Sequence, residues 1–479
     1  MYLKLLGFIM LMLALSGPVF SAHGGEEMNC FPESGEFIDG EVDIPGGNGG
    51  NILDYYITYG LENNLALQQK KENYKLSLEL LNEARGLFYP ALSFNMRYTL
   101  ARGGRVIELP VGDLLNPVYS TLNMLTGTMD FPAIDNEYFY FYRQREQETK
   151  FRVVQPLVNP EIWYNRRIRE HETEIGHIDV EIYRRALVAE IKKAYFNYLK
   201  SGKVERIIEE TIELLNENMR VTSVLAANDM VTDDYIHRSQ AEISAAVQQS
   251  ADAAGKRKIA AAWFNFLLNR PADTPIEVST LTDRGFSIKP EGEGMSTAGG
   301  REELARTGRM IDLAADYERL VQSNRYPRLT AVVEYGLLGT TYSFGRDDDF
   351  MLASLVLSWP LFEGFQNRAS IQQAKIRSNI TGLMHRETEE KLNLQVVNAW
   401  YEFEASAKAV DAAEARLNSA ASAFRITEKR YEAGEAQLIE FIDARTSMTN
   451  AEINLTICRY DFFSSYAEYE RVAALYVFD

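Results

Sequence analysis

The chain has 479 residues and a formal net charge of −18, with 68 acidic against 50 basic side chains. Nucleic-acid binding depends on basic side chains that neutralise phosphates, so this balance excludes a nucleic-acid-binding protein. Its two cysteines, Cys30 and Cys458, are too few for a disulfide-rich scaffold. Cys30 is not expected to carry a lipid, because the residues before it are charged rather than apolar. Cys458 is expected to be a small buried side chain rather than a reactive thiol.

Residues 1–22 have the pattern of a secretory signal peptide. Lys4 precedes an apolar run from Leu5 to Leu15, and small residues end the segment at Ala22. No later stretch approaches the roughly 18 consecutive apolar residues of a spanning helix, so any part of the exported chain that spans a bilayer must consist of strands. Residues 23–50 are rich in glycine and acidic residues and are expected to form a flexible N-terminal segment.

Short sequence patterns occur twice along the chain, which predicts two tandem structural repeats. The Tyr-Pro pair at Tyr89 returns at Tyr326, and the Pro-Leu pair at Pro156 returns at Pro360. The first offset is larger than the second, so the first repeat carries an insertion between these two patterns. We expect the first repeat over residues 51–278, a linker over 279–308 and the second repeat over 309–479.

In the first repeat, a helix is expected from Ile52 to about Leu87. It ends there because Pro90 disfavours helical geometry in the residue before it. From Leu92 to Leu100 apolar and polar side chains alternate, which predicts a strand with one apolar and one polar face. The further elements are a long loop over 102–136, a return strand over roughly 138–154 that completes a strand pair over 91–154, and a long helical hairpin over 163–270.

The second repeat has the same predicted order, with a helix, a strand pair over 328–360 and a helical hairpin over 366–473. Helices of this length would reach on the order of 100 Å, which exceeds a compact domain. Apolar residues recur in them about every 3.5 residues, which is typical of coiled-coil seams. The predicted seam residues are Ile208, Ile212, Leu215, Met219, Thr222 and Ala226 in the first hairpin; Val410, Ala413, Leu417, Ala420, Phe424, Thr427 and Tyr431 in the second; and Phe441, Ala444, Met448, Ala451, Leu455, Cys458, Phe462, Ser465, Tyr469 and Val472 in its returning helix.

Two strands per repeat give four amphipathic strands per chain. Four strands cannot close on themselves, and open edges would leave backbone groups unpaired in hydrocarbon. Three chains would supply 3 × 4 = 12 strands, the smallest cyclic assembly that is expected to leave a water-filled lumen. The same alternation also fits a soluble β-sandwich, and the strands alone do not separate the two interpretations. In the barrel, the candidate lumen residues are Ser93, Asn95, Arg97, Thr99, Thr330 and Glu334.

Taken in order and in duplicate, these motifs resemble the TolC family of outer-membrane efflux proteins over about residues 51–473. The resemblance rests on the Tyr-Pro-x-Leu strand starts, the Pro-Leu strand ends, and the turn Arg430–Gly434 that runs into Leu438–Ala444. It implies a mixed α and β membrane protein: a homotrimer whose twelve-stranded β-barrel crosses the lipid bilayer of the outer membrane and continues into a long periplasmic α-helical coiled-coil barrel. A periplasmic adaptor and an inner-membrane transporter are the implied partners.

The turns of the two helical hairpins are the candidate adaptor-contacting sites, at Asn228, Asp229, Gly434 and Glu435. The first turn departs from the family pattern, because Ala227-Asn228-Asp229 stands where the second has Ala433-Gly434. Asparagine tolerates the left-handed conformation that such a turn requires. Carboxylates at the tips, tripled in a trimer, would form a ring that favours cations at the periplasmic aperture, although helix caps and solvated ends explain the same residues. The aperture candidates are Asp229, Asp233, Asp234, Glu435, Glu440 and Asp443.

Catalytic, metal-binding and cofactor-binding constellations are not recognisable in the sequence. His171 and His177 are six residues apart, whereas zinc chelation from one helical face needs a spacing of four. The acidic run Asp347–Asp349 is expected to be a solvated turn rather than a cation site. The sequence therefore predicts a passive exit duct for small molecules or exported substrates, which is not an enzyme and has no cofactor. The alternative is a secreted or periplasmic coiled-coil rod, a structural or interaction protein without a channel.

Overall fold

The computed structural model of the chain describes residues 52–228, 230–278, 300–341 and 348–478. These residues form α-helices, a four-stranded antiparallel sheet of order β1-β4-β5-β6 and a two-stranded sheet of β2 and β3. The predicted mixed α and β class with four strands in one sheet is confirmed. The predicted signal peptide, the N-terminal segment with Cys30, Asp229 and Asp347 lie outside the described residues.

The chain forms two compact units. The first comprises residues 81–167 and the described parts of 316–374, and it holds both sheets. The second comprises the described parts of residues 28–80, 168–315 and 375–479, and it is helical.

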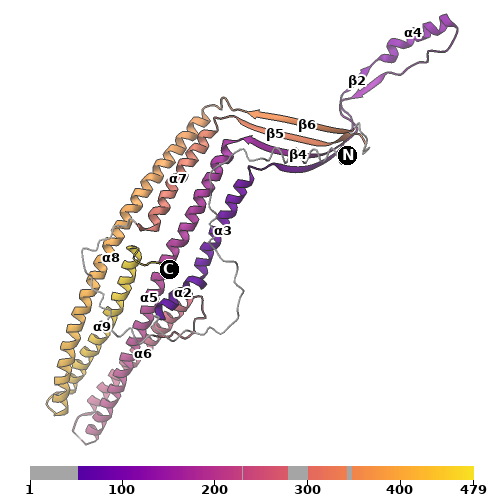
Figure 1. Cartoon of the computed structure of the whole chain (residues 1–479). Helices are drawn as coiled ribbons and strands as arrows, with labels where there is room; N and C mark the ends of the chain where they lie inside the picture. Colours follow the sequence, from indigo (N-terminus) through magenta and orange to yellow (C-terminus); the bar gives the residue numbers. More distant parts are fainter. Residues whose placement is uncertain (1–51, 229, 279–299, 342–347, 479) are drawn as a thin grey trace. The chain divides into compact units, whose positions relative to one another are not determined.

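The main sheet consists of β1 (Ala91–Leu100), β4 (Arg145–Val158), β5 (Arg328–Gly339) and β6 (Asp349–Ser358). The central ladder pairs β4 with β5 and thereby joins the two halves of the chain (Figure 1). Its register shifts between Pro156 and Val158, where a bulge ends the regular pairing. Proline has no backbone N–H to donate, so it is tolerated at such a position.

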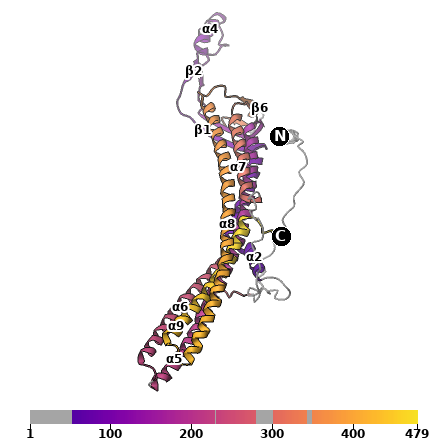
Figure 2. The same cartoon turned by 90° about the vertical axis from the view of Figure 1, so that its left-hand side faces the viewer.

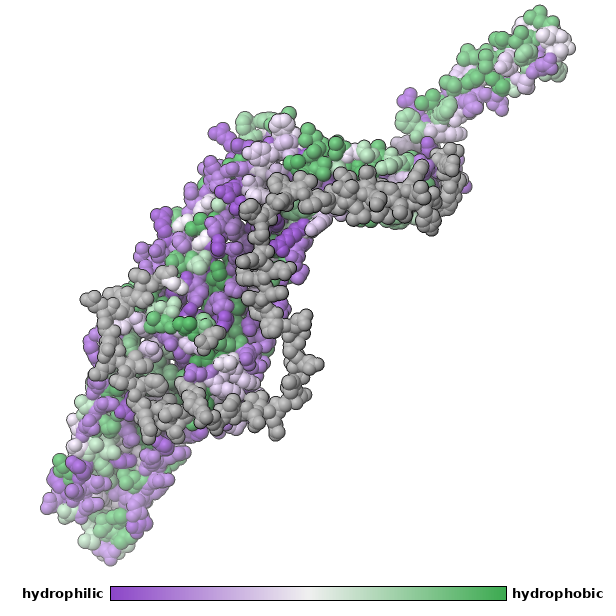
Figure 3. All heavy atoms as spheres, viewed as in Figure 1, coloured by the Kyte–Doolittle hydropathy of each residue, from purple (hydrophilic) through white to green (hydrophobic). Residues whose placement is uncertain are grey.

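The register gives the sheet one continuous apolar face. Phe94 lies opposite Phe151, and Phe151 lies opposite Tyr335 on the next strand. On the outer strands these side chains are exposed: Leu92 is 67% and Leu355 is 71% accessible. Figure 3 shows hydrophobic residues along the strands, whereas hydrophilic residues dominate the visible surface of the helices. A face of this kind requires an apolar environment or a partner.

The connection between β1 and β4 is structured, and the prediction of a long loop followed by a strand from Tyr138 was wrong. It contains β2 (Val106–Leu109), α4 (Val111–Thr126) and β3 (Glu137–Tyr140), and β4 begins only at Arg145. We call residues 102–143 the excursion. Its helix was missed because Pro117 lies inside it and because asparagine side chains that bind backbone groups, described below, hold it in place.

The predicted helix from Ile52 to Leu87 is interrupted at Asn64, which separates α2 (Ile52–Asn63) from α3 (Leu65–Gly86). The Asn64 Oδ1 atom accepts a hydrogen bond from the Leu67 backbone N–H at 2.9 Å. This is the bond of an N-cap, so Asn64 begins a new helix. Its Nδ2 atom donates to the Leu267 carbonyl at 2.8 Å and ties the break to the end of α6.

The remaining helices are α5 (Pro160–Ala227), α6 (Asp233–Leu267), α7 (Glu302–Ser323), α8 (Gln366–Glu432) and α9 (Leu438–Val472). Towards their ends, α5 and α6 form one antiparallel hairpin and α8 and α9 a second beside it (Figures 1 and 2). α7 begins at Glu302, within the residues expected to be a linker. Among the described helices, none combines the length and apolarity that a membrane span requires.

The predicted seams hold the hairpins together. All ten predicted seam residues of α9 are buried or half-buried, including Cys458. Between α8 and α9, the Phe403 ring stacks on Phe462 at a centroid distance of 5.2 Å and on Tyr469 at 5.9 Å. Regular burial at the coiled-coil period therefore accounts for the length of these helices, because packing rather than intrinsic propensity supplies most helical stability.

Ion pairs join α5 to α9 across the second unit. Lys193 Nζ lies 2.5 Å from the Glu468 carboxylate, which Arg471 also contacts at 2.5 Å. Burial alone would raise the pKa of Glu468, but hydrogen bonds from Arg471 and Lys193 outweigh it and lower the pKa to about 2. Two further pairs extend the row, Lys192 with Glu470 at 2.5 Å and Lys200 with Asp461 at 2.9 Å.

The lowered pKa makes stability depend on pH. Because the folded-state pKa of Glu468 lies below its ordinary value of 4.5, its contribution is complete above that value and is lost as the pH falls towards 2. Glu468→Gln should therefore lower the free energy of unfolding at pH 7 by about 1–3 kcal/mol, and by much less at pH 2.5. Denaturant unfolding followed by circular dichroism at both pH values measures this. Asp461→Asn, at a more exposed pair, is the control and should cost less than about 1 kcal/mol. Equal losses for Glu468→Gln at both pH values would contradict the prediction.

Candidate functional site

The turn of the second hairpin, between α8 and α9, is closed by backbone hydrogen bonds around Gly434. The Glu435 N–H donates to the Arg430 carbonyl at 2.8 Å, and the Gly434 N–H donates to the Tyr431 carbonyl at 3.0 Å. Gly434 has a φ of 75°, the left-handed conformation that glycine adopts without steric cost. The Arg430 side chain pairs with Glu440 at 3.6 Å and so bridges the turn.

The turn of the first hairpin is closed by the equivalent hydrogen bond. The Met230 N–H donates to the Leu225 carbonyl at 2.9 Å, and both residues precede their counterparts Glu435 and Arg430 by the same offset, 435 − 230 = 205. The position that matches Gly434 is therefore 434 − 205 = 229, which lies outside the described residues.

Asn228 does not take the left-handed conformation that the sequence interpretation assigned to it, since it is absent from the three described non-glycine residues with positive φ. Instead, its Nδ2 atom donates to the Val224 carbonyl at 2.8 Å. The amide therefore satisfies one of the carbonyls that the end of α5 leaves unpaired.

The two turns share one apolar cluster. Its buried members come from α8 and α9, and the Tyr431 ring stacks on Phe441 at a centroid distance of 4.9 Å. Tyr235 of α6 and Leu214 of α5 pack against this cluster from the first hairpin. Separation of the two tips would therefore expose apolar surface, which opposes such a movement.

Arg445 of α9 lies above this cluster, between the hairpins. Its Nη2 atom is 3.5 Å from Thr211 Oγ1 of α5, and its guanidinium lies 5.4 Å from the centroid of the Phe424 ring. Burial lowers the pKa of Arg445, and the field of nearby glutamates opposes this effect. The sequence analysis missed this residue, because it follows the seam position Ala444 and belongs to no motif.

The described carboxylates of the predicted aperture ring are exposed at the start of α6, in the second turn and at the start of α9. Asp234 accepts a hydrogen bond from Thr232, the N-cap residue of α6, and lies 3.6 Å from Arg238. Asp234 and Glu440 thus have local partners. Among the described residues, the other three have no ion pair: Asp233, Glu435 and Asp443.

The predicted lumen residues share the polar face of the sheet with a charged row that the sequence analysis missed. Arg97 pairs with Glu148 at 2.9 Å, and Glu148 pairs with Lys150 at 2.8 Å. Lys150 also pairs with Glu334 at 3.0 Å, and Glu334 lies 3.5 Å from Arg152. The signal was present in β4, where charged side chains recur at every second residue, the period of a strand face.

This face is less uniform than predicted. On β6, Leu352 lies opposite Glu334 and Val356 opposite Thr330, so an apolar strand borders the charged row. At Gly336 an added Cβ would lie 2.6 Å from the Lys150 Cβ atom. The glycine thus leaves room for the Lys150 side chain to reach Glu334.

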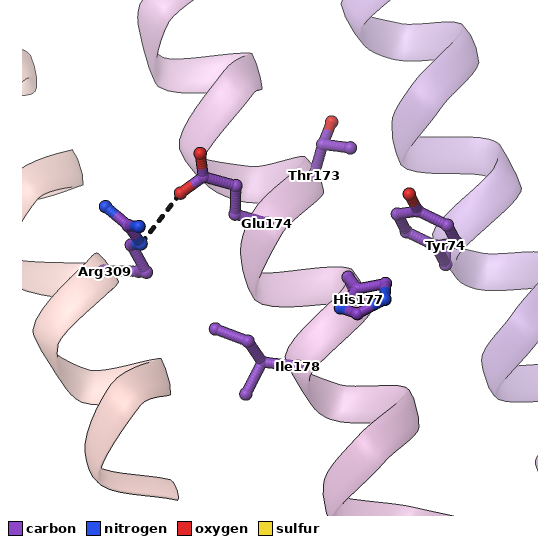
Figure 4. A pocket seen from close by; sticks show the side chains of 6 residues that line it. All are labelled: Tyr74, Thr173, Glu174, His177, Ile178 and Arg309. Atoms are coloured by element: carbon purple, nitrogen blue, oxygen red, sulfur yellow. Dashed lines mark ion pairs between the residues drawn. The ribbon is translucent and has the colours of Figure 1, made fainter. Parts of the chain in front are cut away.

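A pocket of about 310 Å³ lies among α3, α5 and α7 in the second unit (Figure 4). The Glu174 carboxylate pairs with Arg309 at 2.8 Å. The His177 ring lies on the other side of α5, 5.4 Å from the Tyr74 ring. Glu174 and His177, which could suggest a metal site, therefore contact other side chains and point to different sides of α5.

Comparisons with known proteins agree with this architecture. Residues 300–468 match the family model described as outer membrane efflux protein. The chain is 21% identical to the outer membrane protein TolC of Escherichia coli over 86% of this chain and 80% of that protein. It is 25% identical to the alkaline protease secretion protein AprF of Pseudomonas aeruginosa over 71% of this chain and 67% of that protein. Residues 300–468 therefore match the outer membrane efflux protein family, and the chain as a whole is similar to TolC and AprF.

The fold of the chain is also similar to that of a solved structure. The CmeC outer membrane channel of Campylobacter jejuni superposes with a TM-score of 0.73 at 13% identity, covering 88% of this chain and 85% of that chain. The family model matches only part of the second half of the chain, whereas the superposition on CmeC covers most of both halves.

The turn at Gly434 allows a test in which two glycines differ only in backbone conformation. An added Cβ meets nothing within 4 Å at Gly434 or at Gly382 of α8, but only Gly434 has a positive φ. Gly434→Ala should destabilise the protein by about 1–2 kcal/mol because of the left-handed strain. Gly382→Ala should stabilise it by about 0.5–1 kcal/mol, since alanine favours a helix. Unfolding titrations measure both, and a stabilising Gly434→Ala would contradict the assigned turn.

Proposed function

We propose that the chain is the outer-membrane exit duct of a tripartite efflux or secretion system. It passes small molecules or exported substrates passively from the periplasm to the exterior. The observation that carries the proposal is the four-stranded sheet, which has an exposed apolar face and two open edges.

The edges require further strands. β1 and β6 are the edge strands, and each has 10 residues, the length of a tilted membrane-spanning strand. Unpaired backbone groups at such edges each cost several kcal/mol in hydrocarbon. We therefore infer that β1 of one chain pairs with β6 of the next. Three chains close a barrel of 3 × 4 = 12 strands, and the apolar face meets lipid.

The polar face then lines the lumen. Its charges alternate in sign along the row from Arg97 to Arg152 and largely neutralise one another. A compensated row of this kind exerts a weak field on passing molecules, so the barrel discriminates little between cargoes. Selection is left to the helical entrance and to the partners.

The helical unit forms the periplasmic part and docks on a periplasmic adaptor, which connects it to an inner-membrane transporter. The match to the outer membrane efflux protein family supports this assembly, and the similarity to AprF, a protease secretion protein, supports export as one use of the architecture. The alternative of a soluble coiled-coil rod is less well supported, because it leaves the apolar face of the sheet exposed to water.

Reconstitution of the purified protein tests the proposal. We expect a heat-modifiable oligomer of three chains in detergent, and stepwise single-channel currents in planar bilayers. A monomer that stays soluble without detergent and carries no current would refute the channel.

Neighbouring positions of β6 test which face meets lipid. Leu355 lies on the apolar face and Ser354 on the polar face. Leu355→Arg should reduce the heat-resistant trimer, because arginine on a lipid-facing strand costs roughly 2–4 kcal/mol per chain near the bilayer centre. Ser354→Arg should leave the trimer intact. Gel migration without heating measures the trimer in both variants. Equal loss of the trimer in the two variants would contradict the assignment of the lipid-facing side.

We also propose that the tip carboxylates form the cation-favouring ring of the periplasmic aperture. Three features support this proposal: the carboxylates are exposed, they lie at both turns of the sequence, and a trimer would contain three copies of each. The N-cap residues of α6 and α9 are Thr232 and Gln437, so none of the described tip carboxylates is the N-cap of its helix.

Conductance measurements test the ring. Combined neutralisation of Asp233, Glu440 and Asp443 removes 3 × 3 = 9 charges per trimer. We expect the cation-over-anion permeability ratio to fall by about twofold or more, because fixed negative charge concentrates cations. The control neutralises Glu389, Glu390 and Glu402, which are exposed on α8 away from the turn. This control removes the same amount of charge as the tip variant. An unchanged ratio in the tip variant, or an equal fall in the control, would reject the ring.

A further inference from the structure

The excursion, residues 102–143, has no role in the duct proposed above, yet it is an ordered body. Its two ends are joined by a backbone hydrogen bond from the Ala101 N–H to the Gln144 carbonyl at 3.1 Å. Inside it, β2 and β3 form a two-stranded ribbon, and α4 contacts the segment that returns to β3. A two-stranded ribbon alone is marginally stable in water, so other contacts must fix this body.

Two asparagines of α4 supply those contacts. Asn116 donates to the Ile134 carbonyl at 2.8 Å and accepts from the Ile134 N–H at 2.9 Å. Two helical turns later, Asn123 forms the same pair of bonds with the Phe131 backbone, at 2.8 and 3.1 Å. A spacing of two turns puts both side chains on one face of the helix. The polar face of α4 therefore lies inward, against the returning segment.

The apolar face of α4 consequently points outward. Leu114, Val118 and Leu125 are 70%, 51% and 78% exposed, and Met124 is 80% exposed. No charged residue occurs anywhere from Leu114 to Met129. Figure 3 shows hydrophobic residues gathered over α4. An amphipathic helix normally hides this face, so here it is presented to something outside the chain.

The base of the excursion is basic and aromatic. Four arginines flank it, and among the described residues the single ion pair that they form joins Arg143 to Glu146 at 3.9 Å. Next to them, β3 and the following residues present tyrosine and phenylalanine side chains that are more than half exposed. Tyrosine and arginine are typical of a bilayer interface, where rings meet the headgroup level and guanidinium groups meet phosphate. The arginines are Arg102, Arg105, Arg143 and Arg145, and the aromatic residues are Tyr138, Phe139, Tyr140, Phe141 and Tyr142.

We propose that the excursion is a lipid-binding element: the outward face of α4 inserts into the interface of an anionic bilayer, and the basal arginines contact lipid phosphates. An amphipathic helix buries its apolar face at the boundary between headgroups and acyl chains. The five acidic residues of the excursion lie away from its base, at Glu108, Asp113, Asp130, Asp135 and Glu137. At the base, a second copy of this chain is the poorer occupant, because its own four arginines would face the same positive charge. Lipid phosphate complements that charge.

Tryptophan reporters in the full-length protein test the proposal. Leu125→Trp places the reporter on the outward face, and Val118→Trp is a second outward variant in case the first fails to fold. Tyr119→Trp is the control, because Tyr119 points inward and contacts Phe131 at a ring distance of 5.6 Å. Each variant is reconstituted in vesicles that contain phosphatidylglycerol and brominated phosphatidylcholine. The emission of the four native tryptophans, measured on the unaltered protein, is subtracted.

We expect brominated lipid to quench the outward reporters by about half, since an interfacial helix lies within the upper acyl region, and the inward reporter by much less. Replacing the four arginines by glutamine should lower the quenching in anionic vesicles to the level in neutral ones. Quenching of neither outward reporter would overturn the proposal. So would a blue-shifted but unquenched emission together with a disulfide between chains in Leu125→Cys, because a second copy would then cover the face. Channel current recorded in the same vesicles reports the exit duct separately.

Discussion

Backbone pairing between β4 and β5 is the interaction on which the sheet depends. Each half of the chain contributes only two strands to it, and an isolated pair is marginally stable. The eleven residue pairs of this ladder unite them into a four-stranded sheet with a continuous apolar face. Gly336 permits close approach of the strands beside Lys150, so the same ladder also assembles the charged row on the opposite face. Both the lipid-facing and the water-facing properties proposed for the duct follow from this one register.

Sequence periodicity predicted the long elements well, because one physical pattern runs through many residues. The seam of α9 depends on burial at a regular period, and the strands at Leu92 and Leu329 depend on regular alternation of apolar and polar side chains, so both leave a repeated signal. The elements that the sequence analysis missed depend instead on single side chains. Asn64 divides one predicted helix by capping the second part, and Asn116 and Asn123 hold α4 against backbone groups that no periodic pattern reveals.

The candidate site was predictable to a similar extent. The two turns were located by their duplicated sequences, and the structure places both beside one apolar cluster. Arg445 could not have been found in this way, because its importance comes from a contact with Thr211, which is far away along the chain. Asn228 illustrates the opposite error: its tolerance of left-handed geometry suggested a role in the turn, but its amide caps α5 instead. The conformational preference of a residue type shows which backbone conformations that residue tolerates. The register of the turn decides which position must adopt the left-handed conformation.

The closure between Ala101 and Gln144 makes the excursion a self-contained cassette. Its two ends are adjacent, so a short turn could replace all of it while β1 and β4 keep their pairing, and loop-closure entropy changes slowly with length. This also explains how one repeat can accept an insertion between its Tyr-Pro and Pro-Leu patterns without altering the spacing of any later pattern. The same junction is a suitable place to graft a foreign peptide, such as an epitope, for display beyond the end of the strands.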